Sequence, residues 1–584
     1  MYELPRERRQ MMKNLAAVGA LTILSLAIAG CGSSTNTTAT TATPQSGGAV
    51  VIALPEQTSP NWFFPELSLT ADTTVNSEID DMSYEPLVYF NTKDQFDPQH
   101  CLASSVKWNS KGTVYTIQLN RKWHWSNGAP VTAQDVVFTY QLMSAGSQSN
   151  VSYAWAYAGA GSGGMPTLWK SVVATGRYTV QITLNQPSSQ EWFVRNGIGQ
   201  IYPVPKSVWN KYPHSMSQEF QFIQNVSNSP NNAVYKVVDG PYQFQAMSPN
   251  NYWTFVPNPK YDGHKSYVKK VMFQYETSAT AEFTALKQGT VNYGYVPGNL
   301  LGVHSELTND VLTPLYSLGF NYIQLNMSPK APNGIGKAFD ELPVRQALQL
   351  GVNQPGIINA VYHGYGVVDD TTLAPKPKNI FVDPALAKDP YAYNPARGKK
   401  ILEANGWHEV NGVMTKHGIK LEFTMFAASG STSYDHIDQI LQEGWAQEGI
   451  ICHIQYQQFN TVVSYSPSDA SQWAVLNWNG GWGYSSGYPS GGVLFKTGAA
   501  ENSGSYSSNT MNTLINNTYS PGTPNQAIQR MYNYEEYAAK QLPAAIFLPE
   551  FPNLVVHAKN LHGTLTDYNP IGGVIFPSHW WISK

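Results

Sequence analysis

Five consecutive residues late in the chain combine two indole rings, an amide and two glycines, in the order Trp478-Asn479-Gly480-Gly481-Trp482. Indole faces pack against apolar parts of a ligand, an amide donates and accepts hydrogen bonds, and glycine lets another backbone approach closely. This combination suits the capture of a small organic solute. Further aromatic residues lie nearby at Trp473, Tyr484 and Tyr488. For each of them, packing inside the protein is as well supported as contact with a ligand.

The sequence contains no recognisable motif of a catalytic or metal-binding site. The sequence has neither an H-E-x-x-H zinc motif nor a Walker A phosphate loop. Residues 159–164 satisfy G-x-G-x-x-G, but no strand precedes them and Pro166 follows, so we expect a flexible loop. We therefore expect a protein with no catalytic residue, no cofactor and no metal ion. A secreted hydrolase is the alternative from another functional class.

Cys31 is the clearest candidate for a covalent modification, because of the residues that precede it. It follows a basic head with Arg6, Arg8, Arg9 and Lys13, an apolar run from Leu15 to Ala29, and Gly30. The run is shorter than the roughly 20 apolar residues that span a bilayer, and the whole resembles a bacterial lipoprotein signal. The resemblance implies a signal peptide over residues 1–30, acylation of Cys31, and a lipid-anchored protein on the extracytoplasmic face of the cell membrane. Residues 31–47, rich in Ser, Thr and Gly, are predicted to be a flexible linker.

The composition limits the partners. Only 13% of the 584 residues are charged and the formal net charge is −3, which argues against nucleic acid as a partner. Cys101 and Cys452 are the only cysteines after Cys31, so no disulfide framework is possible, and we expect both as free, packed thiols.

The elements that must position these residues alternate between short strands and helices. Strands are expected at residues 49–54, 114–119, 178–184 and 449–454. Helices are expected from Ala133, capped by Thr132 with Asp135 in the first turn, and at residues 279–288, 344–351, 395–405 and 436–447. This interleaving predicts a mixed α/β class with several domains.

One long segment identifies a family. Residues 123–138 read W-H-W-S-N-G-A-P-V-T-A-Q-D-V-V-F, preceded by Y-E-P-L-V at residues 84–88. This resembles the signature W-S-D-G-x-P-V-T-A-x-D-V-x-F of the peptide-binding family (family 5) of solute-binding proteins that serve ABC importers. Further resemblances follow in the family's order at residues 240–242, 281–292, 339–348, 394–407 and 444–454. The signature residues form a turn and start a helix, so we expect structural roles for them.

The resemblance implies a two-lobe periplasmic-binding-protein fold whose lobes close on a ligand by hinge bending. Lobe I would comprise residues 48–84, 200–320 and 548–584, with a subdomain inserted at 85–199, and lobe II would run from 321 to 547. The hinge crossovers would lie near Phe320-Asn321 and Phe547-Leu548. The implied role is that of a monomer delivering a peptide-like solute to the permease subunits of an ABC importer. A ligand-presenting sensor or chaperone lipoprotein is the alternative role.

The resemblance also places the ligand, with one departure. Relatives align a W-x-x-D segment with the bound peptide, and its Asp pairs with the peptide's α-ammonium. Here the segment is residues 478–482, and Gly481 stands where that Asp would be. A free-amine peptide therefore needs another carboxylate, such as Asp469, because a buried unpaired ammonium costs several kcal/mol. Without one, an oligosaccharide is the alternative solute. On the first lobe, Asn61, Trp62 and Phe63 are expected to line the cleft.

Overall fold

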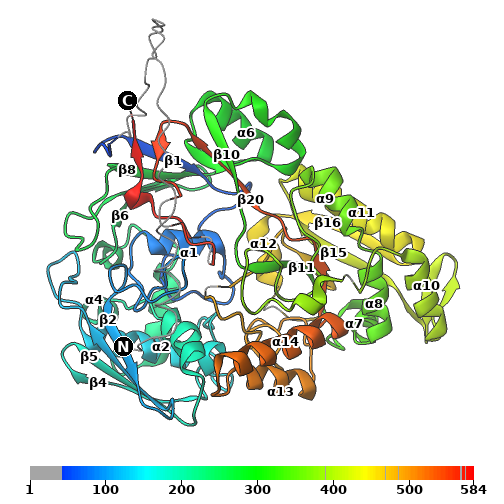
Figure 1. Ribbon diagram of the computed structural model, residues 1–584, viewed down its shortest axis with the longest axis horizontal. Coiled ribbons are helices and arrows are strands. Elements are labelled where there is room, and N and C mark those ends of the chain that lie inside the picture. Colours follow the sequence, from blue (N-terminus) through cyan, green and yellow to red (C-terminus); the bar gives the residue numbers. More distant parts are fainter. Residues whose placement is uncertain are drawn as a thin grey trace, which may run out of the picture. The chain divides into compact units, whose positions relative to one another are not determined.

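The computed structural model describes residues 43–583, apart from 389, 467, 468, 485, 566, 567, 572 and 573. The predicted signal peptide, Cys31 and most of the linker lie outside this part of the chain. Pro44 onward forms one compact unit of mixed helices and strands (Figure 1). No helix in the described part has the length and apolar character needed to span a bilayer.

A seven-stranded sheet collects strands from distant parts of the sequence. Its order is β10-β20-β9-β1-β8-β7-β6, and β1 runs parallel to both neighbours, β8 and β9. Its strands are β1 (Ala49–Ala53), β6 (Tyr242–Ser248), β7 (Tyr252–Pro257), β8 (Lys270–Gln274), β9 (Tyr293–Tyr295), β10 (Asp310–Leu315) and β20 (Asn553–Ala558). Helix α6 (Ala279–Gln288) packs against β9.

A six-stranded sheet takes its strands from the later half of the chain. The order is β16-β15-β17-β11-β18, and β19 also pairs with β11. Its strands are β11 (Gly319–Leu325), β15 (Glu422–Ala428), β16 (Ile451–Gln457), β17 (Val475–Asn477), β18 (Gly481–Gly483) and β19 (Ala545–Leu548). Its surrounding helices are α7 (Ile335–Phe339), α8 (Leu342–Leu350), α9 (Gln354–Tyr362), α10 (Pro395–Ala404), α11 (Thr432–Gln447), α12 (Phe459–Tyr465), α13 (Asn509–Thr518) and α14 (Pro524–Gln541). A small hairpin sheet adds β12 (His408–Val410), β13 (Val413–Lys416) and β14 (Ile419–Lys420).

A separate four-stranded antiparallel sheet lies next to the family signature in the sequence, since residues 123–138 follow β3 and continue into helix α2. Its strands are, in spatial order, β2 (Ala103–Trp108), β3 (Val114–Leu119), β5 (Thr179–Leu184) and β4 (Trp169–Gly176). Helix α2 (Ala133–Gly146) packs against β4 and β5 (Figure 1). The other elements of the described chain are α1 (Thr74–Asp81), α3 (Gln190–Trp192), α4 (Lys206–Trp209), α5 (Met216–Val226), β21 (Leu561–His562) and β22 (Trp581–Ile582).

The signature residues have the structural roles expected of them. The Asp135 carboxylate accepts hydrogen bonds from the backbone N–H and the hydroxyl of Thr132, both at 2.8 Å, which closes a capping box at the start of α2. Its other oxygen accepts from the Lys206 backbone N–H at 2.9 Å, so Asp135 also fixes the start of α4. The Trp123 indole is fully buried and donates to the Cys101 carbonyl at 2.8 Å.

Most predicted elements lie where the sequence placed them. Helix α6 has the predicted bounds, because Ser278 caps it and Gly289 ends it in a left-handed conformation with φ of 70°. Helix α11 begins at Thr432, four residues before the predicted His436, since Ser431 is its N-cap residue. Cys101 and Cys452 are free and buried, as predicted. The glycine-rich stretch at 159–164 is not loose, however: the Trp169 indole donates to the Gly163 carbonyl, and Gly163 is buried.

The chain passes between the two larger sheets at two places. Residues 316–318 connect β10 to β11, and residues 549–552 connect β19 to β20. The residues predicted for the crossovers, Phe320-Asn321 and Phe547-Leu548, belong to the adjoining strands β11 and β19. The connections therefore lie within a few residues of the expected positions.

Many carboxyl groups are buried without a cationic partner. None of the ion pairs between described residues includes these acids. They are Glu66, Asp80, Glu85, Asp239, Asp369, Asp438, Glu448 and Glu535, each at most 6% exposed. Burial raises the pKa of Glu66, Glu85 and Asp438 to about 8 and that of Glu448 to about 10. These groups are therefore held as neutral acids in the folded protein near neutral pH.

This arrangement predicts how stability depends on pH. The folded state binds these protons more tightly than the unfolded state, whose carboxyls titrate near 4. The contribution is fully present below about pH 4 and is lost as pH rises through the folded pKa values of about 8 to about 10. We expect the thermal unfolding temperature to fall between pH 5 and pH 9.

Glu448→Gln provides the specific test, because neither oxygen of Glu448 has a hydrogen-bond partner. We expect this variant to match the parent at pH 5 and to exceed it by more than about 1 kcal/mol at pH 9, since the amide needs no proton. Glu443→Gln, at an exposed position of α11, is the matched control and should leave the free energy of unfolding unchanged at both pH 5 and pH 9. A parent protein that gains stability toward pH 9 would contradict the argument.

Candidate functional site

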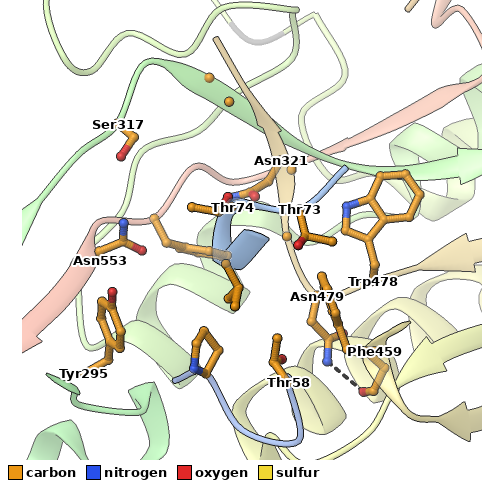
Figure 2. A pocket seen from close by; sticks show the side chains of 18 of the residues that line it. Thr58, Thr73, Thr74, Tyr295, Ser317, Asn321, Phe459, Trp478, Asn479 and Asn553 are labelled. Atoms are coloured by element: carbon orange, nitrogen blue, oxygen red, sulfur yellow. Dashed lines mark hydrogen bonds between the residues drawn. The ribbon is translucent and has the colours of Figure 1, made fainter. Parts of the chain in front are cut away.

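A cavity of about 490 Å³ lies at the two connections between the larger sheets. Connection residues Ser317, Leu318 and Glu550–Pro552 line it. The seven-stranded sheet side contributes Glu56, Thr58, Thr73, Thr74 and Tyr295, and the six-stranded sheet side contributes Asn321, Tyr322, Phe459, Trp478 and Asn479. Figure 2 shows side chains from both sides surrounding one space. A molecule in this cavity would contact both sheets at once.

Hydrogen bonds also join the two sides directly. The Ser429 hydroxyl, after β15, donates to the Gln57 side chain, after β1, at 2.7 Å. The Asn460 amide of α12 donates to the Ser59 carbonyl at 3.1 Å, and the Asn299 backbone N–H donates to the Ser433 hydroxyl at 3.0 Å. The structure therefore represents a state in which the two sides are closed against each other.

The predicted segment 478–482 lines the cavity over its whole length. It leaves β17 through Asn477, whose amide donates to the buried Asp438 carboxyl at 2.7 Å. Asn479 has a left-handed backbone with φ of 62°, and its amide donates to the Ala428 carbonyl at 2.7 Å (Figure 2). The Trp478 ring meets the Tyr322 ring edge to face at 5.2 Å. These contacts fix both the amide and the indole at the cavity wall.

Gly481 has no room for a side chain. It lies on β18, opposite Asn321 in the antiparallel pairing with β11. A Cβ atom at Gly481 would overlap the Phe320 carbonyl oxygen and would come within 2.7 Å of the Asn321 amide oxygen. An aspartate at this position therefore does not fit this backbone, which gives the observed departure from the W-x-x-D pattern a structural reason.

Other predicted residues lie outside the cavity. Trp473 is 1% exposed in a small separate core, while Tyr484 and Tyr488 donate hydrogen bonds to the backbone carbonyls of Thr372 and Thr518. Trp62 and Phe63 are buried in the main core, and Trp62 packs edge to face on Trp155.

Asn61 supports the site from behind. Its amide oxygen accepts a hydrogen bond from the Asn76 side chain of α1 at 2.8 Å, and its backbone N–H donates to the Asn76 amide oxygen at 3.0 Å. The cavity is instead lined on this side by Pro55, Glu56, Thr58 and by residues at the start of α1. Asn61, Trp62 and Phe63 therefore lie a few residues after the part of this stretch that lines the cavity.

The most distinctive property of the lining is its charge. Every charged residue that lines the cavity in the described part of the chain is an acid, and no Lys, Arg or His joins them. The acids are Glu56, Asp72, Glu78, Glu282, Glu501 and Glu550. None of the six was predicted from the sequence, because they are scattered through the chain and follow no motif. Asp469, the replacement carboxylate suggested from the sequence, does not line the cavity.

Burial, and for some the charge of a neighbouring acid, raises the pKa of Asp72, Glu78, Glu282, Glu501 and Glu550. Burial raises the pKa of Glu78 and of Glu550 to about 8, and Asp81 adds to the effect at Glu78. Burial and then the charge of Asp72 raise the pKa of Glu501 well above its usual value. Burial also raises the pKa of Glu282, whose carboxylate accepts from the Tyr295 backbone N–H at 2.6 Å. In the described part of the chain, no three His, Cys, Asp or Glu residues are grouped to hold a metal ion.

Residues 97–501 match the family described as bacterial extracellular solute-binding proteins, family 5. The chain belongs to this family. This solute-binding protein is 25% identical to the oligopeptide-binding protein AppA of Bacillus subtilis over 462 residues, which cover 78% of each chain.

Solved structures show the same fold. The structure of AppA from Bacillus subtilis in complex with a nonapeptide superposes with a TM-score of 0.77 at 23% identity, covering 93% of this chain and 100% of that one. Lactococcal OppA, complexed with an endogenous peptide in the closed conformation, gives a TM-score of 0.75 at 17% identity, covering 91% of each chain. The predicted two-lobe periplasmic-binding-protein fold is therefore confirmed.

The packing at Gly481 generates a stability prediction for this solute-binding protein. Gly481→Ala should lower the free energy of unfolding by about 1 to 3 kcal/mol, because the methyl group must displace the backbone of β11. Gly480→Ala is the control, since its Cβ would meet nothing closer than the Trp478 ring at 3.7 Å, and it should change stability by less than about 0.5 kcal/mol. Urea unfolding of both variants is the measurement, and equal stabilities would contradict the packing argument.

Proposed function

We propose that this protein captures a peptide-like solute outside the cytoplasmic membrane by closure of its two lobes and delivers it to the permease of an ABC importer. The observation that carries the proposal is the cavity at the two connections, lined from both sheets. A ligand drives closure only through contacts that it makes better in the closed state, and a cavity shared by both lobes supplies such contacts. The names of AppA and OppA support a peptide as the solute.

The proposed lobes follow the predicted boundaries. Lobe I comprises residues 48–84, 200–320 and 548–584, the inserted subdomain residues 85–199, and lobe II residues 321–547. The grouping of the strands into sheets supports this division, because β2 to β5 form a sheet of their own. The ligand-binding residues proposed on lobe II are Trp478 to Trp482. The protein works as a monomer and needs no catalytic residue.

An oligosaccharide is the second candidate solute. Trp478 and Trp482 both line the cavity beside Asn479, and ring faces next to an amide suit sugar rings. Native mass spectrometry of gently purified protein, followed by fluorescence titration with pentaalanine and with maltotetraose, separates the two candidates. Tight binding of the sugar without binding of the peptide would overturn the peptide proposal, and turnover of either compound would overturn the non-enzymatic role.

Trp478 tests the proposed site directly. Trp478→Ala should weaken binding of the solute by more than about 1 kcal/mol, because an aromatic surface in the cavity wall is lost. Trp108→Ala is the matched control, since Trp108 is 44% exposed on β2 and does not line the cavity. Fluorescence or calorimetric titration measures the affinity, and circular dichroism verifies folding. Unchanged affinity in a folded Trp478→Ala variant would remove this residue from the site.

The lipid anchor is a separate part of the proposal. We expect Cys31→Ser to release the protein from membranes or to leave it unprocessed, because serine has no thiol to acylate. Membrane fractionation and the mass of the N-terminal peptide are the measurements. Normal membrane retention of a processed Cys31→Ser variant would contradict anchoring through this residue.

A further inference from the structure

The acids that line the cavity all favour the same kind of solute. Six carboxyl groups and no basic group of the described chain line this space. Inside a partly dry cavity, charges interact more strongly than in water, so each acid that ionises attracts a positive group and repels a negative one. A peptide-binding cavity indifferent to ligand charge has no need for this one-sided lining.

The acids are also short of partners within the protein. Asp72, Glu78, Glu501 and Glu550 make no side-chain hydrogen bond or ion pair with the described residues. Glu550 is only 8% exposed, and one oxygen of Glu501 is fully buried without a partner. Carboxyl groups removed from water without partners are costly. A cationic group of the solute would supply the missing partner.

Aromatic rings stand beside the acids. Tyr322 and Trp478 line the same cavity as Glu501 and Asp72. Burial, and after it the charges of Glu501 and Asp72, raises the pKa of Tyr322. Tyr362 stacks on Phe551 with ring centroids 3.6 Å apart, and both also line the cavity. Ring faces attract ammonium and guanidinium groups, so they favour the same kind of solute as the acids.

We infer that the solute is an organic cation, a peptide with net positive charge, whose positive groups pair with Asp72 and Glu501 and with Glu550. This inference rests on the proposed function, because it names the class of solute that the proposed site takes. Asp72 precedes α1 and belongs to proposed lobe I, Glu501 belongs to proposed lobe II, and Glu550 lies in the second connection. A positive group between Asp72 and Glu501 contacts both lobes and thereby favours their closure.

These acids replace the carboxylate that position 481 cannot carry. The Gly481 backbone excludes an aspartate, so a positive group on the solute has to find its partner elsewhere in the cavity. A metal ion is disfavoured as the cation, because the described residues offer no group of three ligands. An ammonium or guanidinium group needs only one or two carboxylates and fits the lining.

The test uses three pentapeptides that differ only in the middle residue: Ala-Ala-Lys-Ala-Ala and the same peptide with Gln or Glu in place of Lys. Each peptide is prepared once with a free N-terminal amine and once with an acetylated N-terminus. All six are titrated into the purified full-length protein, and calorimetry measures the affinity. We expect the Lys peptide to bind at least 10-fold more tightly than the Glu peptide, with the Gln peptide between them. N-acetylation should weaken binding of each peptide.

Variants identify the acids responsible. Asp72→Asn, Glu501→Gln and Glu550→Gln should each reduce the preference for the Lys peptide over the Gln peptide by at least 3-fold. Glu443→Gln, at an exposed position on α11, is the matched control and should keep the preference. Thermal melting shows whether each variant is folded, and the peptide series on the parent protein tests the inference even if one variant is not.

The outcomes separate this inference from the proposed function. Peptides that bind equally well whatever their charge would overturn the inference and leave the proposed function standing. Binding of maltotetraose with no binding of any of the six peptides would overturn both. A charge preference that survives all three substitutions would overturn the assignment to Asp72, Glu501 and Glu550.

Discussion

Two short connections, residues 316–318 and 549–552, join the larger sheets, and the rest of the site depends on this constraint. With so few covalent links, the sheets can change their relative orientation through rotations of a few backbone bonds. The space beside the connections then belongs to neither sheet alone, and a molecule bound there contacts both. Hydrogen bonds such as Ser429 to Gln57 hold the closed arrangement. Each is worth about 1 kcal/mol, so the ligand can decide the balance between open and closed states.

The buried carboxyl groups are a second feature of the whole structure. The protein has few charged side chains, yet many of its carboxyl groups are buried without cations, both in the core and around the cavity. In the core, burial raises the pKa of Glu448 to about 10, and neither of its carboxyl oxygens has a hydrogen-bond partner. In the cavity, the same chemistry has a different effect, because a solute can enter and complete the pair. Burial of an unpaired carboxyl group only costs free energy in the core, whereas in the cavity it favours a solute that supplies a positive partner.

The sequence predicted those parts of the structure that depend on local chemistry. Ser278 and Gly289 mark the ends of α6, and Thr132 with Asp135 starts α2, because caps act on the nearest turn. The segment 478–482, which was chosen because it resembles the family's W-x-x-D segment, lines the cavity. The cavity acids could not be found, since Asp72 and Glu501 are far apart in sequence and only the folded chain brings them to one space. Asn61 is bonded to Asn76 and does not line the cavity, and sequence alone cannot tell which residues of a stretch face a cavity.

The tight pairing of β18 with β11 also links segment 478–482 to one of the two connections between the sheets. A side chain cannot be added at position 481 without displacing β11, because its Cβ atom would overlap the Phe320 carbonyl oxygen. The backbone would have to retreat first, and then the Asn321 amide would lose its hydrogen bond to the Pro549 carbonyl at 3.2 Å, next to a hinge connection. The shape of this cavity wall and the contacts of the connection are therefore coupled, and a change in one disturbs the other.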